Sequence, residues 1–243
     1  MDDNDAVREA FRNQKDVLPF FTRENVNNKI GGLPPLIWAA LYKHTIQTFQ
    51  GLLDLGANVN LMADGSTSTA LTVIAECGNI PVLNLLAPHA TQENKERAFV
   101  RTAQLNLLNV IRLLHEHYGV SLDVRVDGKT ALMNAALKNR VEIVRYLCEH
   151  GANVHLCDDK GENALRHAMW GHNVGICEYL CARGVLVYRL PRFDVFQFPC
   201  IQRQYMRTQI FALVSRAHIG AQIGRIPNEI FRRILDILAG KKE

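Results

Sequence analysis

The residues best suited to chemistry are histidines and cysteines in the C-terminal half of the chain. His150, His155 and Cys157 lie close together in sequence, but they do not form the two close ligand pairs that a structural zinc site needs. The sequence contains no G-x-G-x-x-G, P-loop or H-E-x-x-H motif. We therefore predict no enzyme activity, no cofactor and no metal.

The cysteines and the N-terminus point to a reducing, aqueous setting. The six cysteines are irregularly spaced in a 243-residue chain that is long enough to bury a core without disulfides. The first twenty residues include Asp2, Asp3, Asp5, Arg8 and Glu9, and no later window approaches eighteen uncharged apolar residues. We expect a soluble cytoplasmic protein with no signal peptide and no membrane partner.

The elements that position these residues repeat along the chain. Residues 128–155 and 161–188 align without a gap, and every equivalent pair is 33 residues apart. The aligned pairs include Gly128 with Gly161, Leu132 with Leu165 and, at the end of each unit, Gly151 with Gly184. A repeat of this period predicts a stack of similar units, each of which buries its apolar stripe against its neighbours.

The period and the residues resemble the ankyrin repeat, whose pattern runs G-x-T-P-L-H-x-A-A and ends in G-A-D/N-x-N. Earlier copies lie at 32–60, 69–90 and 99–119, and the third copy is irregular because about five residues are missing between Pro88 and Phe99. The resemblance implies an all-α solenoid of helix pairs with short hairpin loops. The hairpin of the third copy is expected to be short or absent.

The pattern divides the chain into three parts. Residues 1–28 are predicted to form a degenerate capping repeat, residues 29–188 about five ankyrin repeats, and residues 189–243 a C-terminal helical cap or tail. Thr69 and Thr130 are placed to cap the first helices of their repeats. Gly151 and Gly184 are placed to end the second helices in a left-handed conformation.

The repeat also gives the remaining cysteines a structural role. Cys148 and Cys181 are 33 residues apart, so they occupy equivalent sites on neighbouring helices whose axes lie about 8–10 Å apart, which is too far for a disulfide. Cys177 replaces the core Val of the pattern and is expected to pack in the interior.

Repeats of this kind leave hairpin tips and the inner face of each first helix free to bind a protein. Both tryptophans map to this face, where large aromatic side chains are favoured anchors, although packing against an adjacent helix is the alternative for each. The predicted partner-binding residues are Trp38, Leu41, Tyr42, Asp127, Lys129, Leu137, Lys138, Asp159, Lys160, Glu162 and Trp170.

Positive charge is concentrated in the tail. From Ala182 onward there are 11 Lys and Arg residues against 4 Asp and Glu residues, while the whole chain has a net charge of +4. These arginines are scattered among apolar residues at helical intervals, so a solvated or partner-facing helix is favoured over a nucleic-acid surface.

The last part of the tail resembles the opening of an F-box, as found on ankyrin proteins of large DNA viruses. The resemblance covers about thirteen residues, 226–238, and implies binding to a Skp-type adaptor of a cullin ubiquitin ligase. A full F-box would need two further helices, which this chain does not have. The predicted adaptor-binding residues are Ile226, Pro227, Ile230, Ile234, Leu235 and Leu238.

Two alternatives remain for this tail. A SOCS box would begin near Ala212, Leu213 and Ala217, but its cysteine is missing. The tail helices would otherwise only cap the open apolar end of the solenoid. The sequence thus predicts a non-catalytic protein-binding module and, as the alternative, a ubiquitin-ligase substrate receptor, which by resemblance would act inside a host cell.

Overall fold

The computed structural model describes residues 3–185, which form a row of short helices stacked in chain order. The helices are α1 (Asp3–Arg12), α2 (Pro35–Leu41), α3 (Ile46–Asp54), α4 (Ala70–Glu76), α5 (Ile80–Leu86), α6 (Gln92–Thr102), α7 (Leu108–Arg112), α8 (Ala131–Leu137), α9 (Val141–Glu149), α10 (Ala164–Trp170) and α11 (Val174–Ala182). Two 3-10 turns, η1 (Leu18–Phe20) and η2 (Ala87–His89), and a π-helical turn, η3 (Leu113–His117), complete the helical elements.

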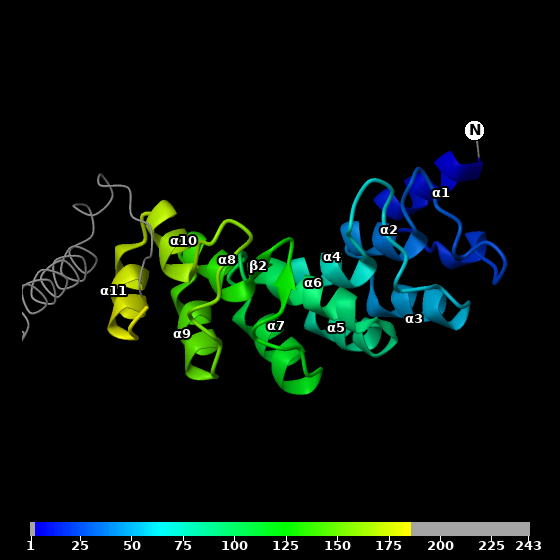
Figure 1. Ribbon diagram of the computed structural model, residues 1–243. Coiled ribbons are helices and arrows are strands. Elements are labelled where there is room, and N and C mark those ends of the chain that lie inside the picture. The colour runs from blue at the N-terminus through cyan, green and yellow to red at the C-terminus, as the bar shows by residue number, and fades with distance from the viewer. Residues whose placement is uncertain (1–2, 186–243) are drawn as a thin grey trace, which may run out of the picture.

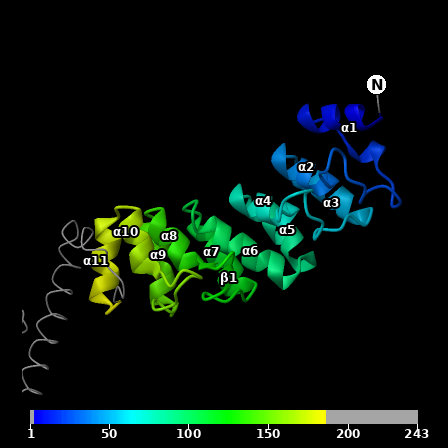
Figure 2. The same cartoon turned by 45° about the horizontal axis from the view of Figure 1, so that its top comes forward.

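The helices pair and form two rows. Each of α2, α4, α6 and α8 contacts the next first helix along the chain, and the second helices α3 with α5 and α7 with α9 also contact each other. Figure 1 shows the first helices as the upper row and the second helices as the lower row, and Figure 2 shows the same stack tilted. The predicted helix-pair solenoid is therefore confirmed for the described residues.

A short antiparallel hairpin precedes α8. Its strands are β1 (Arg125–Val126) and β2 (Lys129–Thr130), and Val126 pairs with Lys129 across the turn. Asp127 and Gly128 have φ values of 50° and 73°, as the two-residue hairpin turn of type I′ requires. Single bridges, Met62 with Thr69 and Cys157 with Asn163, stand at the equivalent places before α4 and α10.

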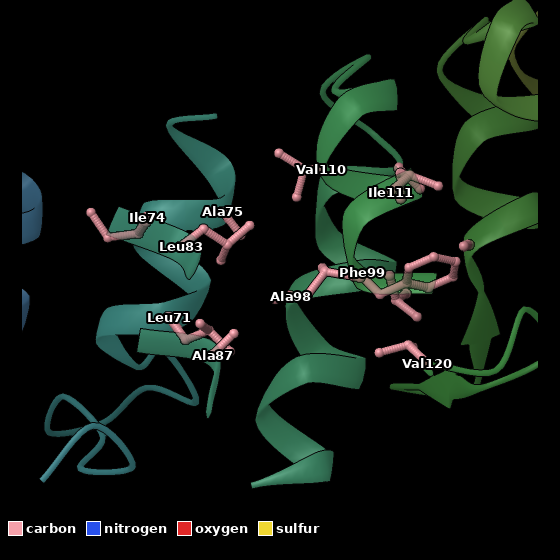
Figure 3. Close-up of a cluster of buried hydrophobic side chains, with 14 of the residues drawn as sticks. Leu71, Ile74, Ala75, Leu83, Ala87, Ala98, Phe99, Val110, Ile111 and Val120 are labelled. Atoms are coloured by element: carbon pink, nitrogen blue, oxygen red, sulfur yellow. The ribbon is translucent and has the colours of Figure 1, made fainter. Parts of the chain in front are cut away.

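The core is continuous from one helix pair to the next. Figure 3 shows Leu83 of α5 and Val110 of α7 on the facing sides of two neighbouring helix pairs, and Phe99 and Ile111 on the far side of α6 and α7, toward the next repeat. These four side chains have no exposed surface. Because the cluster belongs to two helix pairs at once, neither pair can bury it alone, which is why the fold needs stacking.

Local signals set the ends of the helices as predicted. The hydroxyl groups of Thr69 and Thr130 accept hydrogen bonds from the third amides of α4 and α8. Gly151 and Gly184, which follow α9 and α11, have φ values of 94° and 79°. The left-handed conformation is easy for glycine and ends each helix.

The irregular third repeat has the shape that its missing residues predict. Residues 88–99 contain no strand: the chain passes from η2 directly into α6, which Thr91 caps. α6 is 11 residues long, whereas α4 and α8 have 7 residues each. An extra helical turn therefore occupies the place of a hairpin.

The N-terminal segment differs from a full repeat. Its one α-helix, α1, is followed only by the short turn η1 before α2. Phe11 of α1 and Val17 are fully buried, and the Phe11 ring lies 6.0 Å from the ring of Trp38. This segment thus covers the first helix pair with one helix instead of two.

Candidate functional site

Trp170 is the most prominent side chain on the row of first helices. It is the last residue of α10 and keeps 44% of its surface exposed. The His167 ring packs edge-on against the indole with the ring centroids 5.0 Å apart, and the guanidinium carbon of Arg166 lies 5.7 Å from the centroid of the indole ring. Arg166 is itself held by Glu162, with 3.1 Å between Nε and Oε2. The exposed indole is therefore supported on two sides by side chains of its own repeat.

The loop before α10 is tied to that helix by a buried pair. His167 Nε2 lies 3.0 Å from Asp158 Oδ2, and the two side chains are 1% and 6% exposed. The second carboxylate oxygen of Asp158 accepts hydrogen bonds from the amides of Lys160 and Glu162, each at 2.9 Å. This pair fixes the position of the loop that carries Asp159 and Lys160.

Both members of the pair have shifted pKa values. Burial lowers the pKa of His167, although the hydrogen bond and the charge of Asp158 oppose the shift. Burial acts to raise the pKa of Asp158, but hydrogen bonds from the amides of Glu162 and Lys160 and from His167 lower it overall. His167 Nδ1 is buried without a hydrogen-bond partner, so protonation of this nitrogen would leave an unpaired donor.

The C-terminal end of the neighbouring helix α8, at Leu137, lies close to the C-terminal end of α10, at Gly171. A Cβ atom on Gly171 would lie 2.3 Å from the Leu137 carbonyl oxygen, so only glycine allows this approach of the two helix ends. The Asn173 side-chain amide donates to the carbonyl oxygens of Ala136, at 2.7 Å, and of Leu137. Leu137 is half-buried and Lys138 is exposed. Sequence reasoning did not identify these contacts of Gly171 and Asn173.

Trp38 does not offer the exposed indole that its position predicts. It is 6% exposed, and its Nε1 donates to the Ile30 carbonyl oxygen at 2.8 Å. The indole stacks on the Tyr42 ring with the centroids 5.6 Å apart. Trp38 is thus a packing residue under the N-terminal helix, while Tyr42 is half-buried and Leu41 keeps 49% of its surface exposed.

The remaining predicted residues lie at the hairpin tips. Asp127, Asp159 and Lys160 are exposed, and Lys129 and Glu162 are half-buried. Asp159 packs closely over Gly128, where a Cβ atom would collide with its carboxylate. The structure therefore brings the tips of the last two hairpins into contact, and both tips precede the N-terminal ends of α8 and α10, whereas Leu137 and Trp170 are the last residues of these helices.

Another polar link crosses the first helices in the middle of the row. Arg101 of α6 pairs with Glu76 of α4 at 3.5 Å and donates to the Ser68 hydroxyl at 2.9 Å. These half-buried groups satisfy one another, so this part of the row offers fewer free polar groups than the hairpin tips.

The predicted adaptor-binding residues cannot be placed. Ile226, Pro227, Ile230, Ile234, Leu235 and Leu238 lie outside the described residues 3–185. The F-box-like interpretation of the tail therefore stays a prediction from sequence.

The histidines and cysteines among residues 3–185 bear on metal binding and reactivity. No group of three or more His, Cys, Asp or Glu side chains is placed there to hold a metal ion. Cys148 is a free thiol whose pKa burial raises to about 11, so it is protonated at neutral pH and a poor nucleophile. Cys177 is fully buried, as predicted.

The described helices also bear on membrane insertion. The longest of them has 11 residues, and none within residues 3–185 has the length and apolar character needed to cross a lipid bilayer.

Comparison with known families agrees with the repeat geometry. Residues 99–189 match the family model described as ankyrin repeats, in three copies. No curated protein matches the chain. The same helix-pair arrangement continues before the matched region, in α2 with α3 and α4 with α5. Residues 99–189 thus carry ankyrin repeats, a type of repeat that mediates interactions between proteins.

Proposed function

We propose that the chain is a non-catalytic module that binds a partner protein on the face formed by its first helices and hairpin tips. The carrying observation is Trp170, whose indole stays 44% exposed while Arg166 and His167 pack against it. A large aromatic side chain that is already ordered loses little entropy when a partner covers it.

The surroundings of Trp170 complete a binding surface of mixed character. Leu137 supplies apolar surface at the same end of the neighbouring helix, and the tips with Asp127, Asp159 and Lys160 supply exposed charges at the opposite end of the first helices. Interfaces commonly have such an anchor with a polar rim. Leu41 and Tyr42 extend the same row of first helices at its N-terminal end.

The test is affinity capture of partner proteins with the full chain, compared with two variants. Lys129→Glu with Lys160→Glu reverses charges at the hairpin tips, and Trp170→Ala removes the anchor. The partner captured by the parent should lose about tenfold or more in affinity to each variant, with unchanged helical circular dichroism. Equal capture by the parent and both variants would place the binding surface elsewhere.

The alternative function, a substrate receptor of a ubiquitin ligase, adds a second binding site to the partner-binding face around Trp170. It depends on residues 226–238, which resemble the opening of an F-box and lie outside the described region. In that case the face around Trp170 holds the substrate and the tail holds the adaptor.

A further inference from the structure

The exposed indole of Trp170 packs against a buried side chain that can change its charge. The His167 ring lies edge-on to it, with the ring centroids 5.0 Å apart, and is itself 1% exposed. His167 Nε2 lies 3.0 Å from Asp158 Oδ2, while Nδ1 is buried without a hydrogen-bond partner. The anchor of the proposed binding face therefore rests on an imidazole that has one paired and one unpaired nitrogen.

The neighbouring repeat shows that stacking does not require a histidine here. The residues 33 positions before His167 and Trp170 are Asn134 and Leu137, and neither side chain titrates. Asn134 donates to the Val100 carbonyl oxygen and so holds the preceding helix α6. A titratable group under an exposed indole thus distinguishes α10 from α8.

The charges that act on His167 come from the loop and the strand beside it. Asp158 and Glu162 of the loop favour the protonated ring, and Lys129 of β2 opposes it. Helix α8 has no titratable side chain, and the one charged residue of α11, Glu178, is exposed. Burial is the largest effect and lowers the pKa of His167, so the ring is neutral at pH 7.

Protonation changes what the site must accommodate. It adds a hydrogen to Nδ1 of His167, and a buried N–H donor without an acceptor is costly. The charged ring is therefore more stable where water reaches Nδ1, which is outside its place against the indole. Trp170 then keeps the contact with Arg166, whose guanidinium carbon lies 5.7 Å from the indole centroid, but loses the contact with the imidazole.

We propose that His167 is a positioning residue for Trp170, and that its protonation in mild acid releases the indole and weakens binding of the partner protein. This regulation rests on the proposed function, in which Trp170 anchors the partner. An anchor that has become mobile must be ordered again when the partner covers it, and this ordering costs affinity. Affinity should therefore fall as the pH falls from about 7 to 5.

Acrylamide quenching of Trp170 fluorescence between about pH 7.5 and 5 tests the release without any partner. The full chain with Trp38→Phe serves as the parent, because Trp170 is then the only tryptophan and an aromatic ring still faces Phe11. The quenching constant should rise by about twofold in acid, since the indole is already 44% exposed, with a midpoint below about 6.5.

Two matched variants replace a histidine by asparagine, the residue that stands 33 positions earlier in both cases, at Asn134 and Asn139. His167→Asn should remove the pH dependence of quenching. His172→Asn changes an exposed histidine two residues beyond Trp170 and should keep it. A quenching constant that is independent of pH in the parent, or equally dependent on pH in both variants, overturns the proposal.

Helical circular dichroism of the same samples separates local release of the indole from unfolding. The helix signal should stay constant while the quenching constant rises. Quenching that rises only together with a loss of helix overturns the proposal.

The effect on binding is measured with the partner captured by the full chain, at about pH 7.5 and 5.5. The parent should lose about tenfold or more in affinity in acid, and His167→Asn should lose about twofold at most. Equal losses in these two proteins overturn the regulation, and the binding face stands if Trp170→Ala binds weakly at pH 7.5. Full affinity of Trp170→Ala at pH 7.5 instead overturns the binding face itself.

Discussion

His167 Nε2 lies 3.0 Å from Asp158 Oδ2, and this contact joins the buried face of α10 to the loop that precedes it. At neutral pH the imidazole is neutral, donates from Nε2 and leaves Nδ1 without a partner. The equivalent residue one repeat earlier is Asn134, whose side-chain amide donates to the Val100 carbonyl oxygen. Asn134 reaches back to the preceding helix α6, whereas His167 bonds the loop of its own repeat, and of the two only the imidazole is a titratable group.

The first prediction concerns the pH dependence of stability. The pKa of His167 is lowered in the folded state, so the unfolded chain binds more protons as the pH falls below the ordinary histidine value of about 6.5. His167 therefore makes stability decrease as the pH falls from about 7 toward 5. His167→Asn should flatten this part of the stability curve, as measured by urea unfolding at several pH values.

A second decrease is expected at lower pH from Asp158. Its pKa is lowered in the folded state, so its stabilising effect is present above about 4 and is lost as the pH falls through the folded-state pKa. Asp158→Asn should reduce the loss of stability in that range. If the free energy of unfolding of His167→Asn falls between pH 7 and 5 as steeply as that of the parent, the role assigned to the buried imidazole is contradicted.

The second prediction concerns the cap of α8. Thr130 Oγ1 accepts a hydrogen bond from the Met133 amide at 3.3 Å. Thr130→Ala leaves this amide unpaired and should lower the free energy of unfolding by about 1 kcal/mol. Thr130→Ser keeps the acceptor and should recover most of the loss. Chemical denaturation distinguishes the two, and an equal loss in both variants would show that the methyl group, and not the cap, stabilises this position.

The third prediction concerns the hydrogen bond between neighbouring second helices. Tyr146 is 3% exposed, and its hydroxyl donates to Glu116 Oε1 at 2.9 Å. Burial and the Glu116 carboxylate raise the pKa of Tyr146 to about 12. Tyr146→Phe should cost about 1–2 kcal/mol of stability, because the bond is to a charged group. The same substitution in a Glu116→Gln background should cost less, and a double-mutant cycle measures the difference.

The solenoid could be predicted from the repeat pattern because each sequence signal, such as a capping residue or a core residue, acts within one repeat. The capping threonines, the left-handed glycines and the buried Cys177 depend on the turn or helix in which they occur. The absence of a hairpin before α6 also followed from sequence, since too few residues separate Pro88 from Phe99 to build one, whereas the extra turn of α6 was not predicted.

The state of the two tryptophans could not be predicted in the same way. They map to the same face by register, yet Trp38 is buried against Phe11 of the atypical N-terminal helix, while Trp170 is exposed. The contact that buries Trp38 joins segments 27 residues apart and has no counterpart in the repeat. The pairing of His167 with Asp158 was likewise not predicted, because the position of Asp158 depends on the path of a loop and does not follow from helical spacing.

The fourth prediction concerns the tail and is made from its sequence. If residues 226–238 bind a Skp-type adaptor, Ile230→Asp with Leu235→Asp should abolish co-purification of the adaptor and leave the melting temperature nearly unchanged. If the segment only caps the solenoid, the same variant should lower the melting temperature, because a buried charge is left unpaired. Lys241→Asp, which lies beyond the stripe, is the control and should affect neither measurement.

The last prediction tests the stacking that the whole fold depends on. Leu147 of α9 is fully buried, and Arg145 of the same helix is exposed. Leu147→Asp places an unpaired carboxylate among apolar side chains, and the loss should exceed about 4 kcal/mol and unfold the C-terminal repeats. Arg145→Asp introduces the same acid on the solvent side, where it should cost under about 1 kcal/mol. Circular dichroism should therefore show a partial loss of helix for the first variant and none for the second. If Leu147→Asp melts like the parent, α9 does not pack in the register described here.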